Sequence, residues 1–216
     1  MALRVIPQAA AEHLEDLAYL TTCLKADPQT AEFVPNVEAV STRLRAMSMD
    51  WNVHRHAVRE MQMGLRRARH ALGNVVRAAQ FAILDDVRHH RSDPRYLTYF
   101  PRGLAAFTRS SYVDQLAAVR NLARQCTRDP NPKIREQAGL VHAATDRMVA
   151  AFTRLSDAQV VESEACGRLQ AEKIQAVRTC RSIGHRLEDL YPDEPARARS
   201  YFRPICHRRR RREVNR

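Results

Sequence analysis

The chain has 216 residues and a formal charge of +12, and only 6% of its residues are aromatic although 44% are hydrophobic. This length is enough for one domain or two small ones with a real core. No apolar run is long enough for a signal peptide or a membrane-spanning helix, so we expect a soluble, cytoplasmic protein without a membrane partner.

The first two predicted helices differ greatly in length. Leucines recur on one face from Gln8 to Lys25, which predicts a helix that ends at Asp27-Pro28. Asn36 to His90 contains no proline, and its apolar residues follow an unbroken 3,4 spacing, which predicts one very long helix with a narrow apolar seam. The seam consists of Val37, Val40, Leu44, Met47, Trp51, His54, Val58, Met61, Leu65, Ala68, Leu72, Val75 and Ala79.

Shorter helices are expected after this run. Ser92-Asp93-Pro94 has the residues of a cap and first turn, so we expect a short helix that ends near Tyr99-Phe100. A third main helix is predicted from Tyr112 to Thr127, and Asp129-Pro130-Asn131-Pro132 closes it.

A second run without proline extends from Lys133 to Tyr191 and predicts another very long helix. A short segment from Ala196 to Phe202 follows Pro192 and Pro195. The seam of the second long helix consists of Met148, Phe152, Leu155, Gln159, Glu162, Cys166, Leu169, Lys173, Ala176, Cys180, Ile183, Leu187 and Leu190.

The two halves of the chain repeat at a constant offset of 102 residues, which indicates an internal duplication. The matched pairs are Leu14 and Leu116, Leu20 and Leu122, Asp27-Pro28 and Asp129-Pro130, and Tyr99-Phe100 and Tyr201-Phe202. We therefore predict a first helical repeat over 1–107 and a second over 108–205, packed with the first into one bundle. Residues 206–216 are expected to form a basic, disordered tail.

The predicted fold class is all-α: an elongated four-helix-type bundle in which each repeat supplies a short helix, a very long helix and a short return helix. A helix of about 55 residues is roughly 80 Å long, so one short helix cannot cover it. We expect the two long helices to be parallel to each other. Residues 93–100 and 112–127 would form one descending line, and residues 193–202 and 8–25 the other.

An alternative arrangement breaks the long helices near their middles. Ser156-Asp157-Ala158-Gln159 has the form of a capping box, and Ser48 to Asn52 is a weaker candidate. Such breaks would give a more globular bundle of shorter helices. The unbroken phase of both seams favours continuous helices.

A run of arginines near the C-terminus is the sharpest basic feature. It consists of Arg208, Arg209, Arg210, Arg211 and Arg212. Such a run can neutralise phosphates and release their counterions, which gives sequence-independent affinity for nucleic acid or another polyanion. The same composition is also typical of a solubilising tail.

A second basic feature is a stripe along the first long helix. It consists of Arg55, Arg59, Arg66, Arg69 and Arg77, and Glu60 is the only acid between Trp51 and Phe81. The stripe could follow a phosphate backbone. Alternatively, it is a solvated face or pairs with acids in the matching part of the second repeat, namely Asp157, Glu162, Glu164 and Glu172.

Polar residues at or near the seams are candidate metal ligands. His54, Glu60, Gln159 and Glu162 could form a polar layer, but the Glu-x-x-His pattern of di-metal bundles is absent, so we expect hydrogen bonds that fix the helix register. His89 and His185 lie close to acids near the ends of the long helices and are equally weak candidates. We expect no metal site and no cofactor.

The cysteines are odd in number and form no C-x-x-C pair, so small side chains in a core are expected rather than disulfides or a zinc site. They are Cys23, Cys126, Cys166, Cys180 and Cys206.

The repeated aromatic pairs are interpreted in two ways. Tyr99 and Phe100, like Tyr201 and Phe202, could seal the bundle where a short helix folds back, or they could form a paired docking surface.

The chain contains no nucleophile motif and no phosphate-binding loop, so we do not expect an enzyme. The sequence favours a non-catalytic helical interaction, scaffold or assembly protein that binds a protein partner or itself. The alternative is a nucleic-acid-binding accessory protein.

Overall fold

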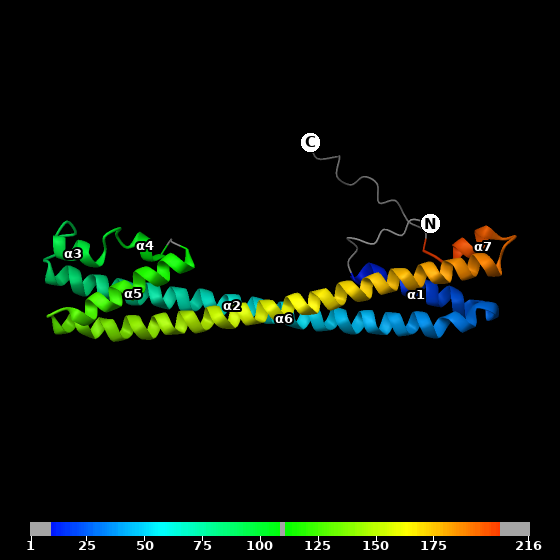
Figure 1. Cartoon of the computed structure of the whole chain (residues 1–216), viewed down its shortest axis with the longest axis horizontal. Helices are drawn as coiled ribbons and strands as arrows, with labels where there is room; N and C mark the ends of the chain where they lie inside the picture. Colours follow the sequence, from blue (N-terminus) through cyan, green and yellow to red (C-terminus); the bar gives the residue numbers. More distant parts are fainter. Residues whose placement is uncertain (1–9, 109–110, 204–216) are drawn as a thin grey trace, which may run out of the picture. The chain divides into compact units, whose positions relative to one another are not determined.

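The structure is a computed structural model that describes residues 10–108 and 111–203. Every regular element in these ranges is a helix, which confirms the all-α fold class (Figure 1). The elements are α1 (Ala10–Ala26), the 3-10 helix η1 (Pro28–Phe33), α2 (Val34–Asp86), α3 (Pro94–Tyr99), α4 (Ala105–Thr108), α5 (Tyr112–Arg128), α6 (Pro132–Leu190) and α7 (Pro195–Ser200). None of the helices in the described part of the chain is long and apolar enough to cross a membrane.

Both long helices are continuous. Ser48 lies inside α2 and Ser156 inside α6, so the breaks of the alternative arrangement do not occur and the favoured continuity is confirmed. α2 ends a few residues before the predicted His90, because Arg88 and His89 adopt left-handed backbone angles with φ of 52° and 64°. The amide of His89 donates to the carbonyl of Leu84 (2.7 Å), which closes the helix end without the glycine that usually marks such an end.

Short polar side chains set the starts of the shorter elements. Asp27 accepts a hydrogen bond from the Gln29 amide (3.0 Å), Asp93 from the Arg95 amide (2.8 Å), and Ser111 from the Asp114 amide (3.2 Å). The predicted stop at Asp27-Pro28 and the predicted cap at Asp93 are therefore confirmed. The sequence did not predict η1 and α4.

The chain folds into two compact units. Unit 1 contains Met1–Arg55 and Glu162–Arg216, and unit 2 contains His56–Val161. These units do not coincide with the predicted repeats 1–107 and 108–205, because each unit takes part of α2 and part of α6.

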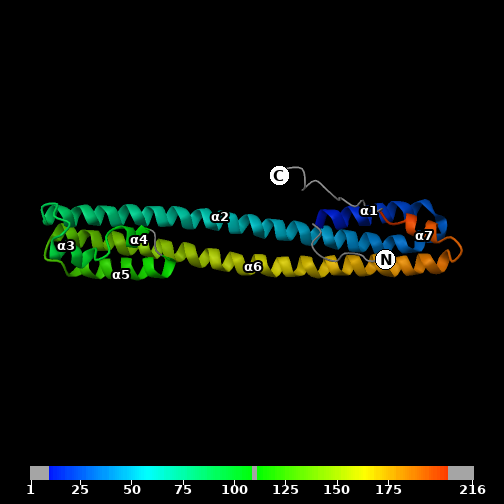
Figure 2. The ribbon, with the colours of Figure 1, turned by 90° about the horizontal axis from the view of Figure 1, so that it is seen from above.

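In unit 1, leucines of α1 pack against α2 and α6, and residues of α7 complete this core (Figures 1 and 2). Leu17, Leu24 and Leu44 are among the buried side chains. Cys180 is also buried and has a free thiol, as predicted for a small core side chain.

In unit 2, α5 packs against the last part of α2 and the first part of α6, beside α3 and α4 (Figures 1 and 2). Leu72, Leu122 and Met148 are among the fully buried side chains. Cys126 is buried here with a free thiol, and burial raises its pKa to about 11. Cys206 lies outside the described residues.

The direction of the long helices corrects the prediction. We expected them to be parallel. Within unit 1, however, the Nε of Arg43 lies 2.9 Å from Glu172, and Trp51, further along α2, bonds to Glu162, which comes earlier in α6. The two helices are therefore antiparallel in this unit. In unit 2, Asn131 at the start of α6 donates to Asp86 at the end of α2 (2.8 Å), which is again antiparallel.

The reason for this error lies in the segment between α2 and α5. Tyr99 bonds to Asp129 and the carbonyl of Phe107 accepts from Gln115, so the segment from α3 to α4 returns antiparallel to α5. α5 then runs in the same direction as the end of α2. The prediction places both residues 93–100 and residues 112–127 on the returning line, but only the segment from α3 to α4 returns.

Candidate functional site

The first candidate site in unit 2 is a stretch of α2 and α6 in which no side chain is buried. It consists of residues 56–71 of α2 and 149–161 of α6, and we call it the open segment. Leu72, directly after the α2 stretch, and Met148, directly before the α6 stretch, are fully buried. α5 is the helix that covers the neighbouring part of α2 and α6. Its first residue, Tyr112, stacks on Phe152 of α6 with ring centroids 4.0 Å apart, so the covering by α5 ends at about this position.

The open segment exposes large apolar side chains. Val160 is 57% exposed, Met63 48% and Val161 41%. Seam residues such as Met61 and Leu65 are half-buried there, whereas the seam residues Leu72 and Ala79 in the core of unit 2 are buried. The apolar surface is thus one that a further helix normally covers in a bundle.

The arginine stripe runs through the open segment. Arg59 and Arg66 are exposed and Arg69 is half-buried, and none of them forms an ion pair with a carboxylate in the described part of the chain. The Nη1 of Arg66 donates to the Sδ of Met63, at 4.0 Å. Arg77 is exposed and likewise has no ion pair within residues 10–108 and 111–203.

The acids expected to neutralise the stripe are engaged elsewhere or unpaired. Glu172 pairs with Arg43, and Glu162 accepts from Trp51. Asp157 and Glu164 are exposed and have no ion pair among the described residues. The stripe in unit 2 is therefore a solvated face rather than an ion-paired one.

The polar seam residues fall into different units. In unit 1, the Trp51 indole nitrogen donates to Glu162 (2.6 Å), Arg55 lies over the Trp51 ring at 5.1 Å, and His54 lies 3.3 Å from Asp50. A hydrogen bond from Arg168 lowers the pKa of the same Asp50. Glu60 and Gln159, the other two residues of the expected polar layer, belong to unit 2.

The weak metal candidates are placed apart. His89 lies 3.5 Å from Asp85 in unit 2, and His185 lies 3.5 Å from Glu188 in unit 1. No group of three or more histidine, cysteine or acidic side chains that could hold a metal ion occurs within the described residues.

Each unit contains an aspartate that collects hydrogen bonds from a tyrosine and an arginine. In unit 2, both carboxylate oxygens of Asp129 accept from Arg95 (3.0 Å each), and Tyr99 also donates to this carboxylate. Burial alone would raise the pKa of Asp129, but the hydrogen bonds from Tyr99, the Asn131 amide and Arg95 outweigh it and lower the pKa. Burial and the bond to Asp129 raise the pKa of Tyr99.

In unit 1, Asp27 has the corresponding role. It accepts from Tyr191 (2.6 Å), Tyr201 (2.6 Å) and Arg197 (2.8 Å). The hydrogen bonds from Tyr191 and then Tyr201 hold the pKa of Asp27 below its usual range. Arg95 and Arg197 are separated by 102 residues, like Tyr99 and Tyr201, and a comparison of the halves could have identified this arginine pair, which we missed.

The repeated aromatics lie largely inside the units. Tyr99 and Tyr201 are 6% and 5% exposed, Phe100 is fully buried, and Phe202 is half-buried. This placement favours the interpretation of these residues as seals of the helix packing. The five arginines Arg208–Arg212 lie outside the described residues.

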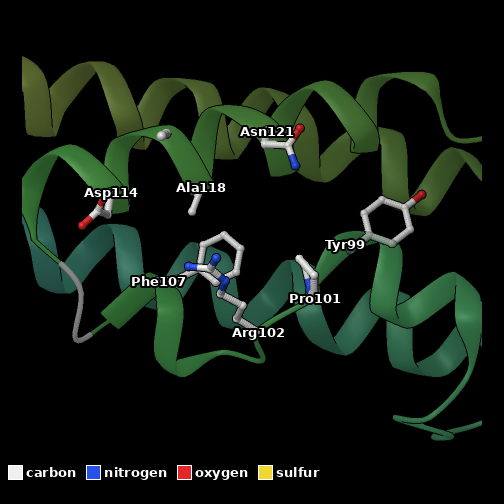
Figure 3. A pocket seen from close by; sticks show the side chains of 8 residues that line it. Tyr99, Pro101, Arg102, Phe107, Asp114, Ala118 and Asn121 are labelled. Carbon is white, nitrogen blue, oxygen red and sulfur yellow. The ribbon is translucent and has the colours of Figure 1, made fainter.

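The second candidate site is a pocket of about 550 Å³ in unit 2, which the sequence did not predict. Figure 3 shows its two walls, one from α5 and one from the segment that runs from the end of α3 into α4. The first wall contains Asp114, Ala117, Ala118 and Asn121, and the second contains Tyr99, Pro101, Arg102 and Phe107. Gly103, with φ of +68°, turns the chain between Arg102 and Phe107.

In comparisons with protein-family models, with curated proteins and with solved structures, nothing matches this chain.

Proposed function

We propose that the protein is a non-catalytic helical assembly protein that associates with a second copy of itself through the open segment. The observation that carries this proposal is the absence of any buried side chain in residues 56–71 and 149–161, where large apolar side chains are exposed. Covering such a surface with helices from another chain removes apolar area from water, which is the main favourable term in association.

Charge on the same helices supports a second copy as the partner. Within the open segment, α2 presents unpaired arginines such as Arg59 and Arg66, and α6 presents the unpaired acid Asp157. An antiparallel pair of chains can place the arginines of one copy beside the acids of the other. The interface then has an apolar centre and a charged rim, as stable interfaces commonly do.

We also infer that the two units arose by duplication of one helical repeat. The support is the recurrence of one set of contacts: aspartates 27 and 129, arginines 197 and 95, and tyrosines 201 and 99, each pair separated by 102 residues.

Sedimentation equilibrium of the full chain tests the assembly proposal. We expect an oligomer that persists from about 0.1 to about 1 M salt, because apolar burial is not screened as surface charge is. A chain that ends at Ile205 should associate equally well, since the interface lies in α2 and α6.

Matched variants locate the interface. Val160→Glu places a charge in the open segment and should dissociate the oligomer. Leu140→Glu is the control, because Leu140 is on the same helix in the same unit and is 54% exposed, close to the 57% of Val160. A wild-type chain that is monomeric at all concentrations, or equal effects of the two variants, contradicts the proposal.

The alternative function is binding of nucleic acid or another polyanion, and the unpaired arginines of the stripe favour it. Neutralisation of phosphates by Arg59, Arg66 and Arg69 would release counterions and make the affinity steeply dependent on salt. Base stacking is not expected, because no aromatic residues alternate with these arginines.

Fluorescence anisotropy with labelled duplex DNA and with RNA distinguishes this alternative from assembly. The full chain and the chain that ends at Ile205 are compared across a salt series. A steep slope that is lost on truncation assigns the binding to the tail, and a slope reduced by replacing the three stripe arginines with glutamine assigns it to α2. Lack of binding near physiological salt by either chain rejects the alternative.

A further inference from the structure

The pocket of unit 2 has a counterpart position in unit 1 that carries different chemistry. There, Arg203, in the segment after α7, lies 2.5 Å from Glu15 and 3.9 Å from Asp16, both on α1. The residues 102 positions after these acids are Ala117 and Ala118, which form part of the pocket wall on α5. In unit 1, two carboxylates thus lie beside the guanidinium of Arg203. At the equivalent sequence positions, unit 2 has the methyl groups of Ala117 and Ala118, which line the pocket.

One charged side chain that lines the pocket, Arg102, is exposed and is not ion-paired within the described residues. Asn121, on the facing wall, is half-buried, and its carboxamide has no hydrogen-bond partner among the described side chains and backbone groups. Figure 3 shows Arg102 on one wall and Asn121 with Ala118 on the other, so both polar groups are available to one occupant.

The apolar part of the pocket is held in place. The Phe107 ring packs edge-on against Phe100, with centroids 5.2 Å apart and planes at 63°. The Gln115 side chain donates to the carbonyl of Phe107 (2.6 Å), and Tyr99 is bonded to Asp129. A ligand can therefore bind without first ordering these walls, which preserves affinity.

One carboxylate limits the charge of the occupant. Asp114 lies at one end of the pocket, and its carboxylate accepts from the Ser111 hydroxyl (2.6 Å) at the start of α5 (Figure 3). A second negative charge on the ligand would be repelled by Asp114. A single carboxylate can instead lie against the guanidinium of Arg102.

We propose that this pocket binds a monocarboxylate with an apolar body, with Arg102 pairing with the carboxylate and Tyr99, Pro101 and Phe107 contacting the body. The carboxylate can belong to a free organic acid or to the C-terminus of a peptide. This binding is independent of the proposed self-association, because none of the pocket residues lies in the open segment.

A titration of the full chain, followed by amide chemical shifts, tests the proposal with 3-phenylpropionate as the probe. We expect saturable shifts in α5 and in the segment between α3 and α4, and about tenfold weaker binding of the neutral 3-phenylpropionamide. Arg102→Gln should weaken binding of the acid about tenfold and leave binding of the amide unchanged. Arg124→Gln is the matched control, because Arg124 is an exposed arginine of α5 that does not line the pocket.

Ala118→Leu provides a second, independent test, since its larger side chain fills the hollow and should abolish binding of acid and amide alike. Acetyl-Gly-Phe with a free or an amidated C-terminus distinguishes the two sources. Tighter binding of the free-terminus peptide than of 3-phenylpropionate assigns the site to chain ends, and the reverse order assigns it to small acids. Equal binding of charged and neutral probes, or unchanged binding in both variants, overturns the proposal.

Discussion

Replacing Asp129 with alanine is expected to destabilise unit 2 by about 3 kcal/mol. The side chain of Asp129 is 2% exposed and accepts from Tyr99, Arg95 and the Asn131 amide (2.7 Å). Without it, the buried Tyr99 hydroxyl loses its acceptor, which costs about 1–3 kcal/mol, and the Asn131 bond adds about 1 kcal/mol. Arg95 adds little, because its side chain is 41% exposed and can return to water.

The asparagine variant separates charge from hydrogen bonding. Asp129→Asn keeps an acceptor for Tyr99 and for the Asn131 amide, so we expect a loss of about 1 kcal/mol. If the bond between Tyr99 and Asp129 contributes as described, combining Tyr99→Phe with Asp129→Ala should destabilise less than the sum of the single variants.

Urea unfolding followed by circular dichroism measures these losses, and hydrogen exchange in α5 assigns them to unit 2. The exchange measurement is needed because a chain with two units can unfold in more than one step. A loss below about 0.5 kcal/mol for Asp129→Ala, the usual range for surface changes, would refute this account of the turn.

The pKa shifts predict an acid-dependent loss of stability in both units. The pKa values of Asp27 and Asp129 are lowered by folding, so the folded state binds fewer protons than the unfolded state in acid. The stabilisation is present above the unfolded pKa of about 3.9 and is lost as the pH falls below it. Asp129→Asn should remove part of the loss of stability of unit 2 as the pH falls below about 3.9, and an unchanged profile would contradict this role.

Three further predictions concern single positions. Gly103→Ala should lower the stability of unit 2 by about 1 kcal/mol through its φ of +68° alone, because nothing lies within 4 Å of the added methyl group, and thermal unfolding measures this. Glu162→Ala should shift the fluorescence of Trp51, the single tryptophan, to longer wavelength, because the indole loses its 2.6 Å bond and meets more water. The Cys126 thiol, buried and with a pKa of about 11, should react with a disulfide reagent at least about tenfold more slowly than the half-buried Cys23, as thiol titration of the native protein can measure.

The sequence predicts the long helices better than it predicts which parts of them are packed against other helices. The 3,4 spacing identified both long helices and their continuity, because seam periodicity depends only on which residues face a partner. The spacing does not tell whether another helix covers a given part of the seam. Met61 and Leu72 have equivalent seam positions, yet Met61 is half-buried and Leu72 is fully buried, because Leu72 packs in the core that includes α5.

The relative direction of α2 and α6 could not be predicted from the 3,4 spacing either. A seam has the same spacing in either direction, so the antiparallel arrangement became visible only through contacts such as Arg43 with Glu172. The pocket was missed for a related reason. Its walls combine α5 with an irregular segment that has no periodicity. Only Ala117 and Ala118, which align in sequence with the acids Glu15 and Asp16 at the 102-residue offset, could have drawn attention to it.

Hydrogen exchange of the full chain at low and high protein concentration tests the assembly proposal most directly. If the open segment is the interface, amides in residues 56–71 and 149–161 should exchange at least about tenfold more slowly at high concentration, while those around Leu140 should not change. Exchange that is independent of concentration, or added protection confined to other helices, would contradict the proposal.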